Sequence, residues 1–167
     1  MLKKLHHNAY RCRDSEETRK FYEDFLGLRL AGTLEIKETK SGRATQTLHT
    51  FYELDDHSYL AFFEAPDMPF EFKTQHDFDL HIALEVDEAV LKPMMVKGRE
   101  RGIETRGISD HGFIHSIYFR DPNGYVIELT AKLAGHDRAM DPATNGARAK
   151  LDRWQAAKSQ KAARVQA

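Results

Sequence analysis

Apolar and polar residues alternate in two long stretches of the chain, and each stretch predicts one strand, one helix and three further strands. In the first stretch, strands are predicted at 5–12, 29–38, 45–54 and 58–64, and the helix at 15–26. Asp14, with Glu17 three residues later, is a pattern that begins helices, and Gly27 is typical of a helix end. Phe21 and Phe25 fall on one stripe of this helix, as expected for a face that packs on a sheet.

The same order recurs about seventy residues later along the chain. Strands are predicted at 80–86, 103–106, 116–120 and 125–131, and the second helix at 88–101. Pro93 lies inside this helix and removes a backbone hydrogen bond, so either the first turn is irregular or the regular helix begins near Pro93. His7 and His81 occupy equivalent positions at the beginning of the two first strands.

Two copies of a β-α-β-β-β unit predict an α+β fold. We expect two βαβββ modules, at about 5–64 and 78–131, that form a curved mixed sheet around a cup, with both helices on the convex side. Residues 1–132 are predicted to form this domain, and residues 133–167 a C-terminal loop and helical extension.

The extension has a thin apolar stripe. Asp141-Pro142 is a good helix start, and residues 143–165 are rich in Ala, Lys, Arg and Gln, with Leu151 and Trp154 as the main apolar side chains. Such a helix is marginal on its own. We expect a solvated extension, with a contact in a dimer as the alternative.

The composition argues against several classes of function. The 25 basic and 26 acidic residues give a net charge of -1, without the basic footprint of a nucleic-acid-binding protein. There is neither an apolar run that could cross a bilayer nor a signal-type segment after residues 1–4, so we expect a cytoplasmic protein with no membrane partner. Cys12 is the only cysteine, which excludes an internal disulfide, and we predict that it is buried.

Glu128 lies in the middle of an apolar, β-branched strand, where a carboxylate is costly unless it is hydrogen-bonded, ion-paired or bound to a metal. His7 and His81 should face the same way as each other because they are equivalent in the repeat. Two imidazoles and one carboxylate on a concave face form a set that holds a divalent metal with open coordination positions. The alternative is that Glu128 pairs with Arg11 or Arg120.

A second pair of residues follows from the same register. Arg11 and Glu85 come four residues after His7 and His81, on the same face of their strands. We therefore predict an ion pair between them at the floor of the cup.

Three stretches resemble the vicinal oxygen chelate superfamily, which includes glyoxalase I, bleomycin-resistance proteins, fosfomycin-resistance transferases and extradiol dioxygenases. They are HHNAYRCRDSEETRKFYEDFLGL, DLHIALEVDE and SIYFRDPNGYVIELT, and the resemblance covers about residues 5–131. It implies paired βαβββ modules, a homodimer, and a metal in the cup bound by His7, His81 and Glu128. Whether one chain builds the cup or two copies share it stays open.

Differences among the members of this superfamily favour one reaction. Glyoxalase I usually has a fourth ligand, a glutamate, where the repeat places Phe62, which can neither bind a metal nor transfer a proton. Fosfomycin-resistance transferases are expected to have a hydroxyl where Ala9 lies, and bleomycin-resistance proteins lack the three ligands. Extradiol dioxygenases use the same three ligands on Fe(II), with a tyrosine at the position of Tyr118 and further histidines, for which His111 or His115 could serve.

The sequence therefore predicts a metal-dependent vicinal oxygen chelate enzyme, and an extradiol-type ring-cleaving dioxygenase is the favoured reaction. Tyr118, His111 and His115 are the predicted catalytic residues, and the substrate is a catechol-like aromatic diol. Fe(II) is the favoured cofactor, with Mn, Ni, Zn or Co as alternatives. Phenylalanines are candidates for an apolar wall of the pocket: Phe51, Phe62, Phe63, Phe70, Phe72 and Phe113. The alternatives are a non-redox glyoxalase-like lyase or isomerase, a thiol transferase, and a small-molecule binding or resistance protein.

Overall fold

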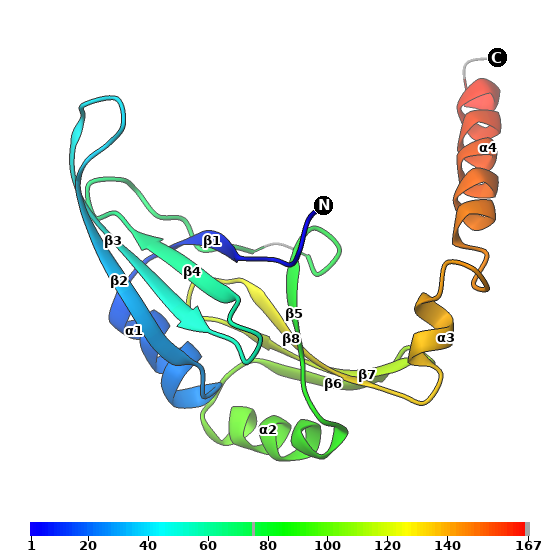
Figure 1. Cartoon of the computed structure of the whole chain (residues 1–167), viewed down its shortest axis with the longest axis horizontal. Helices are drawn as coiled ribbons and strands as arrows, with labels where there is room; N and C mark the ends of the chain where they lie inside the picture. The colour runs from blue at the N-terminus through cyan, green and yellow to red at the C-terminus, as the bar shows by residue number, and fades with distance from the viewer. Residues whose placement is uncertain (75, 166–167) are drawn as a thin grey trace.

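The computed structural model describes residues 1–74 and 76–165 and contains two βαβββ modules followed by a helical extension (Figure 1). Module 1 consists of β1 (His7–Cys12), α1 (Ser15–Arg19), a π-helical segment η1 (Lys20–Phe25), β2 (Arg29–Glu38), β3 (Ala44–Glu53) and β4 (Tyr59–Glu64). Module 2 consists of β5 (His81–Glu85), α2 (Glu88–Glu100), β6 (Thr105–Asp110), β7 (Ile114–Arg120) and β8 (Val126–Lys132). The extension contains α3 (His136–Met140) and α4 (Ala147–Val165).

The two modules repeat the same strand order. In the described residues the strands form two four-stranded mixed sheets, ordered β1-β4-β3-β2 and β5-β8-β7-β6. The pairs β1–β4 and β5–β8 are parallel, and all other neighbours are antiparallel. The predicted α+β fold of two βαβββ modules is thereby confirmed, with its curved sheet divided into two halves. β1 and β5, which begin with His7 and His81, are both edge strands.

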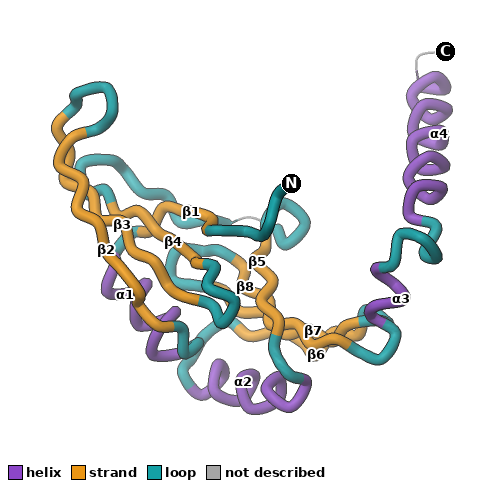
Figure 2. The backbone as a smooth tube through the Cα atoms, viewed as in Figure 1, coloured by secondary structure: helices purple, strands orange, loops and turns teal. Residues whose placement is uncertain are grey.

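One face of each sheet is covered by helices, which lie on the same side of the molecule (Figure 2). Alternate strand residues point to this face, among them Phe62, Ile117 and Phe119, each at most 1% exposed. The helices join the two modules, because the ring of Phe25 from η1 packs edge-on against Phe119 of β7, with centroids 5.1 Å apart. Cys12 is 1% exposed in the same core, as predicted. The opposite faces of the two sheets are not covered by helices, so their side chains can take part in a functional site.

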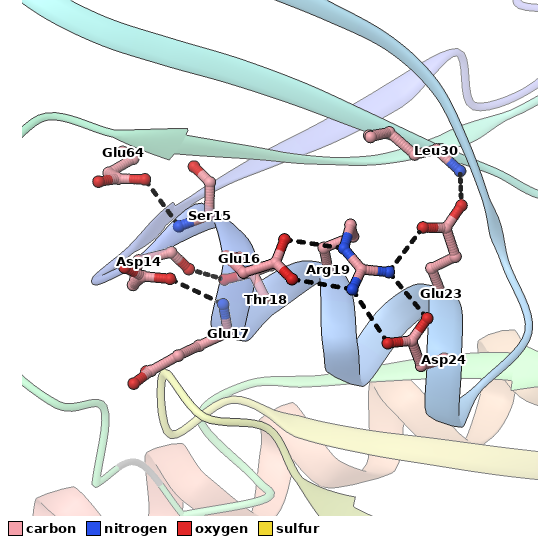
Figure 3. A network of polar contacts seen from close by, with 10 residues as sticks. All are labelled: Asp14, Ser15, Glu16, Glu17, Thr18, Arg19, Glu23, Asp24, Leu30 and Glu64. Carbon is pink, nitrogen blue, oxygen red and sulfur yellow. Dashed lines mark hydrogen bonds and ion pairs between the residues drawn. The ribbon is translucent and has the colours of Figure 1, made fainter.

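The helix α1 begins as its sequence predicts. The side chain of Asp14 accepts a hydrogen bond from the backbone nitrogen of Glu17 at 2.7 Å. Figure 3 shows how Arg19 then holds three acidic side chains on the outer surface, those of Glu16, Glu23 and Asp24. The predicted helix is a single continuous element, although its second half adopts the wider π-helical turn.

The helix α2 contains Pro93 in its interior. It begins at Glu88, and its first turn is tightened by a bond from the nitrogen of Val90 to the oxygen of Asp87 at 2.9 Å. Such an i to i−3 bond belongs to a 3₁₀-type turn. Of the two alternatives drawn from the sequence, the irregular first turn is therefore the one adopted.

The buried turn between β7 and β8 forms hydrogen bonds with residues of module 1 and so holds the two modules together. The Tyr22 hydroxyl donates a hydrogen bond to Asp121 at 2.9 Å, and the side-chain oxygen of Asn123 accepts one from the backbone nitrogen of Arg13 at 2.9 Å. Burial raises the pKa of the Asp121 carboxyl, while the hydrogen bonds from Asn123 and Tyr22 act in the opposite direction. Gly124 has a φ of +95°, and a Cβ there would overlap the backbone of Lys73.

The extension differs from its prediction at the start. Asp141-Pro142 does not begin a helix, because the Asp141 carboxylate accepts bonds from the nitrogen of Ala143 and the hydroxyl of Thr144 and so closes a turn. The long helix α4 begins at Ala147, five residues after Pro142, and the short helix α3 was not predicted. No helix in residues 1–74 and 76–165 has the length and apolar character needed to cross a membrane.

Candidate metal site

The candidate site lies on the open face of the second sheet. Strand register places Ala83 of β5 and Tyr118 of β7 on either side of Glu128 of β8, in one row across the sheet. Because alternate residues share a face, Ser116 and His81 point to the same side as this row. Three strands thus position the side chains that surround the carboxylate.

Glu128 is 4% exposed, and its burial is compensated by polar neighbours. One carboxylate oxygen accepts hydrogen bonds from the hydroxyls of Ser116 and, at 3.4 Å, Tyr118. The other oxygen lies 3.2 Å from Nε2 of His81. The alternative that an arginine pairs with Glu128 is wrong for Arg120, which instead binds Glu104 at 2.9 Å.

The hydrogen bonding of His81 fixes which of its nitrogens can bind a metal. Its Nδ1 lies 2.8 Å from the backbone oxygen of Asp77, and because a carbonyl oxygen only accepts, Nδ1 carries the hydrogen. A neutral imidazole then directs the lone pair of Nε2 at the carboxylate oxygen of Glu128. Two acceptors that face each other are stabilised by a cation between them or by a proton on Nε2.

This donor set fits a divalent metal ion. An imidazole nitrogen and a carboxylate oxygen are ligands that such ions accept, and the backbone bond to His81 and the hydroxyl bonds to Glu128 are the supports commonly found around metal ligands. His81 and Glu128 are therefore in place to bind a metal together.

Tyr118 and His111 form a pair beside Glu128. Nε2 of His111 lies 3.0 Å from the Tyr118 hydroxyl, which in turn contacts Glu128. Burial and the nearby carboxylate raise the pKa of Tyr118, so that the phenol keeps its proton at neutral pH. The arrangement is a short hydrogen-bonded chain from an exposed imidazole to the candidate metal ligand.

His115, the other predicted catalytic histidine, does not join this cluster. It lies within β7, next to Ser116, and therefore points to the helix-covered face. There its Nδ1 is 3.0 Å from a carboxylate oxygen of Glu88 in α2. The prediction treated His115 as a loop residue, whereas the strand begins one residue earlier, at Ile114.

His7 lies on the open face of the first sheet. Its Nδ1 is 2.8 Å from Nδ1 of His6, and its ring centroid lies 5.7 Å from Phe51 and 6.3 Å from His49. Among the residues that the structure describes, no three His, Cys, Asp or Glu side chains are grouped closely enough to hold a metal ion. His7 therefore does not meet the other two predicted ligands within this chain.

The counterpart of Glu128 in module 1 is Ala61, not Phe62. Ala9 of β1 pairs with Ala61, as Ala83 of β5 pairs with Glu128. The predicted register was wrong by one residue, and a one-residue shift moves a side chain to the other face. Phe62 is fully buried on the helix side. The chemical consequence is unchanged, because Ala61 offers no fourth ligand either.

The predicted ion pair between Arg11 and Glu85 is also wrong. Arg11 donates to the backbone oxygens of Ala65 and Met68, each at 3.3 Å, and Glu85 pairs with Lys132 at 2.8 Å. Each of the two side chains therefore has other partners, and they do not pair with each other.

An aromatic wall on the first sheet was only partly predicted. Phe51 and Phe63 were among the candidate wall residues, but His49 was missed. Its ring stacks on Phe63 at 3.7 Å with an interplanar angle of 11°, and its Nδ1 lies 3.0 Å from the oxygen of Phe62. The sequence could have predicted this position of His49, because His49 is two residues before Phe51 in the same predicted strand and so shares its face.

Comparisons with known proteins agree with this architecture. The model of the Glyoxalase/Bleomycin resistance protein/Dioxygenase superfamily matches residues 4–129. Two curated relatives, the lactoylglutathione lyases of Neisseria meningitidis serogroups A and B, are each 30% identical over 141 residues, which cover 80% of this chain and 94% of the relative.

Solved structures share the fold at lower sequence identity. A fosfomycin resistance protein, FosX of Listeria monocytogenes, in complex with Mn(II) and sulfate, has a TM-score of 0.62 and 16% identity over 83% of this chain and 99% of that one. A glyoxylase/bleomycin resistance protein/dioxygenase domain from Frankia has a TM-score of 0.63 and 16% identity, over 80% of this chain and 100% of that one. With the family match over most of its length, the chain belongs to the glyoxalase/bleomycin resistance protein/dioxygenase superfamily, the vicinal oxygen chelate proteins.

Proposed function

We propose that this protein is a metal-dependent enzyme whose substrate chelates, through two adjacent oxygens, a divalent ion held by His81, Glu128 and His7. The observation that carries the proposal is the pair formed by Nε2 of His81 and the buried carboxylate of Glu128, 3.2 Å apart. The reaction we favour is extradiol ring cleavage of a catechol-like substrate with Fe(II).

In this proposal Fe(II) supplies the redox chemistry with dioxygen, and the protein residues orient the diol and move its protons. Ser116 and Tyr118 fix one oxygen of Glu128, which leaves the other oxygen for the metal. When substrate binds, the Tyr118 phenol, which keeps its proton, would turn this proton from the Glu128 oxygen 3.4 Å away to a substrate oxygen, and Ser116 would still hold that oxygen of Glu128. His111 lies within hydrogen-bond distance of that phenol and is exposed to solvent, which suits a residue that passes a proton between the phenol and water.

The aromatic wall supports a planar substrate. The ring of His7 lies beside Phe51 and His49, so a metal bound by His7 would have this wall next to it. The paired strand positions on this face are taken by the small side chains of Ala9 and Ala61, of which Ala61 is fully buried. Flat apolar faces of this kind bind an aromatic ring by stacking.

We further propose that His7 comes from a second copy of the chain. His7 and His81 both lie on edge strands, β1 and β5, whose outer edges pair with no other strand among the described residues. His7 is exposed, whereas its two proposed co-ligands already meet in module 2. A symmetric dimer would then contain two identical shared sites.

Mixing two defective variants tests the shared site. His7→Ala and His81→Ala should each lose the metal, measured by elemental analysis. In a mixed dimer one site carries both substitutions and the other carries none. With random exchange half of the dimers are mixed, so about a quarter of the wild-type metal content should return. Recovery of no metal after confirmed subunit exchange would show that the ligands lie in one chain.

Oxygen consumption with catechols tests the reaction. Protein loaded with Fe(II) under anaerobic conditions should consume oxygen when a catechol is added. Tyr118→Phe and His111→Asn should lower kcat by roughly 10²- to 10⁴-fold while the iron content stays at its wild-type value. The matched control is His115→Asn, which alters a histidine on the face of β7 opposite to Tyr118 and should leave kcat unchanged. Equal losses in His111→Asn and His115→Asn would refute the assignment.

A non-redox lyase is the second candidate, favoured by the 30% identity to lactoylglutathione lyases. It is disfavoured by Ala61, which stands where glyoxalase I is expected to have a glutamate that transfers a proton. Turnover of lactoylglutathione by the Zn- or Ni-loaded protein, with no oxygen uptake from catechols, would replace the dioxygenase proposal with this one.

A further inference from the structure

The helix α4 projects from the body of the protein. Figure 1 shows it standing apart from both sheets at the end of the chain. Two of its large apolar side chains are open to solvent, Leu151 at 49% and Trp154 at 66% exposure. They are three residues apart and therefore lie on one face of the helix. Most of the stability of a protein helix comes from the packing of one face, so a partner that covers this face would stabilise α4.

The segment before α4 holds the helix in a defined direction. The chain leaves the second sheet with a bond from the nitrogen of Leu133 to the oxygen of Phe113 at 3.0 Å. Asp141 then closes a turn, and Asn145 donates to the oxygen of Ala139 at 3.1 Å and accepts from the nitrogen of Ala147 at 2.8 Å. These bonds join α3 to α4 and hold α4 in place. We call the helix α4 the arm of the protein.

The arm is basic around its apolar residues. Over residues 147–159 it carries four basic side chains, Arg148, Lys150, Arg153 and Lys158, against one acidic side chain, Asp152. Lys150 precedes Trp154 by four residues and Lys158 follows it by four, so both are neighbours of the indole on the helix surface. A complementary surface would have an apolar floor and an acidic rim.

The body of the protein contains such a surface between its two modules. A cleft of about 740 Å³ has an apolar floor formed by Leu26, Leu28, Leu54, Leu84, Val86, Val90, Met94 and Leu129. Four carboxylates line it, those of Asp55, Asp56, Asp87 and Glu85, the last of which is paired with Lys132, and no lysine or arginine is among its described lining residues. Its volume lies in the range of sites that bind a ligand side chain or small molecule.

We infer that the α4 arm of one copy docks into the acidic cleft of a second copy, with Trp154 and Leu151 on the apolar floor and the basic side chains at the carboxylates. Two features favour this occupant. The charges of the arm and the cleft are opposite, and a helix of 19 residues is about 28 Å long, enough to bridge two molecules. In a symmetric dimer each copy would give one arm and receive one.

The single tryptophan of the chain makes docking directly measurable. With the full-length protein, we expect Trp154 fluorescence to shift to shorter wavelength and acrylamide quenching to fall as the concentration rises through the dimer dissociation constant. Trp154→Ser should weaken dimerisation by roughly tenfold to a hundredfold in analytical ultracentrifugation, as an aromatic anchor does.

Charge reversal tests the site on the body. Asp55→Lys with Asp87→Lys should expose Trp154 at a concentration where the wild type protects it. Glu35→Lys with Glu38→Lys, the same charge change on the distant strand β2, should not. Adding Lys150→Glu and Arg153→Glu to the cleft variant should restore the protection. Circular dichroism verifies that each variant is folded.

Three results would overturn the inference. They are a dimer in which Trp154 stays fully quenchable, protection of Trp154 in a protein that sediments as a monomer, which reflects docking within one chain, and protection that appears only with vesicles of anionic lipid. All three are independent of metal content and activity, so they separate this inference from the proposed reaction.

Discussion

The hydroxyl of Tyr22 offers a test of how the two modules are held together. It donates to an Asp121 oxygen that has one other donor among the described residues, the side-chain amide of Asn123 at 3.1 Å. Tyr22→Phe keeps the ring but removes a hydrogen bond to a buried carboxylate. Bonds of this kind contribute about 1.5–3 kcal/mol, so we expect a loss of that size in the free energy of unfolding at pH 7. The melting temperature should fall by about 2–4 °C per kcal/mol.

The loss should depend on pH because burial raises the pKa of Asp121. A carboxyl whose pKa is raised on folding contributes its full stability below the unfolded pKa, near 3.9, and loses it as the pH rises through the folded pKa. Without the hydrogen bond from Tyr22 the pKa of Asp121 in the folded protein is higher still, so more stability is lost as the pH rises. The difference between wild type and Tyr22→Phe should therefore grow from acid to neutral pH.

Tyr52 provides the matched control. Both tyrosines are 0% exposed, with ring centroids 5.5 Å apart, but the Tyr52 hydroxyl has no hydrogen-bond partner among the described residues. Tyr52→Phe should be neutral or stabilising. Urea unfolding followed by far-UV circular dichroism is the suitable assay, since Trp154 lies outside the core. Equal losses in the two variants, or a loss in Tyr22→Phe that does not change with pH, would refute the reasoning.

Three further predictions concern other parts of the fold. Burial raises the pKa of the Cys12 thiol to about 11, so a thiol reagent should react with it only after denaturation, and the stability due to its burial should be lost as the pH rises toward that value. Gly124→Ala should destabilise strongly by overlap with Lys73 and a positive φ, whereas Gly32→Ala, with nothing within 4 Å, should change the urea midpoint little. Arg19→Ala should lower the melting temperature slightly at low salt and less at high salt, because its ion pairs are at the surface.

The sequence was sufficient for local structure because local structure depends on neighbouring residues. The alternation of apolar residues predicted both modules, the spacing of Asp14 and Glu17 predicted the start of α1, and the position of Cys12 on the strand face opposite His7 predicted its burial. The carboxylate of Glu128, set in an apolar strand, correctly marked the place where polar groups converge.

The errors arose where one residue in a turn decides which way a strand faces. Ala61 rather than Phe62 matches Glu128, and His115 lies within β7 rather than before it. Both mistakes come from the length of a connection, which apolar periodicity does not determine. The predicted ion pair between Arg11 and Glu85 is wrong for another reason. It required a contact between the two sheets, and the residue pattern of a strand carries no information on how one sheet lies relative to another.

The position of His7 illustrates the same limit at the level of assembly. Alternation indicates that His7 and His81 face the open side of their sheets, but not that those sheets belong to one cup. Edge strands such as β1 and β5 expose unpaired backbone groups and are usually covered in native proteins. In our proposal a second copy covers them, brings His7 to Glu128 and receives the α4 arm. Each chain then contributes ligands to both metal sites, so the amount of bound metal and the fraction of dimer should fall together on dilution.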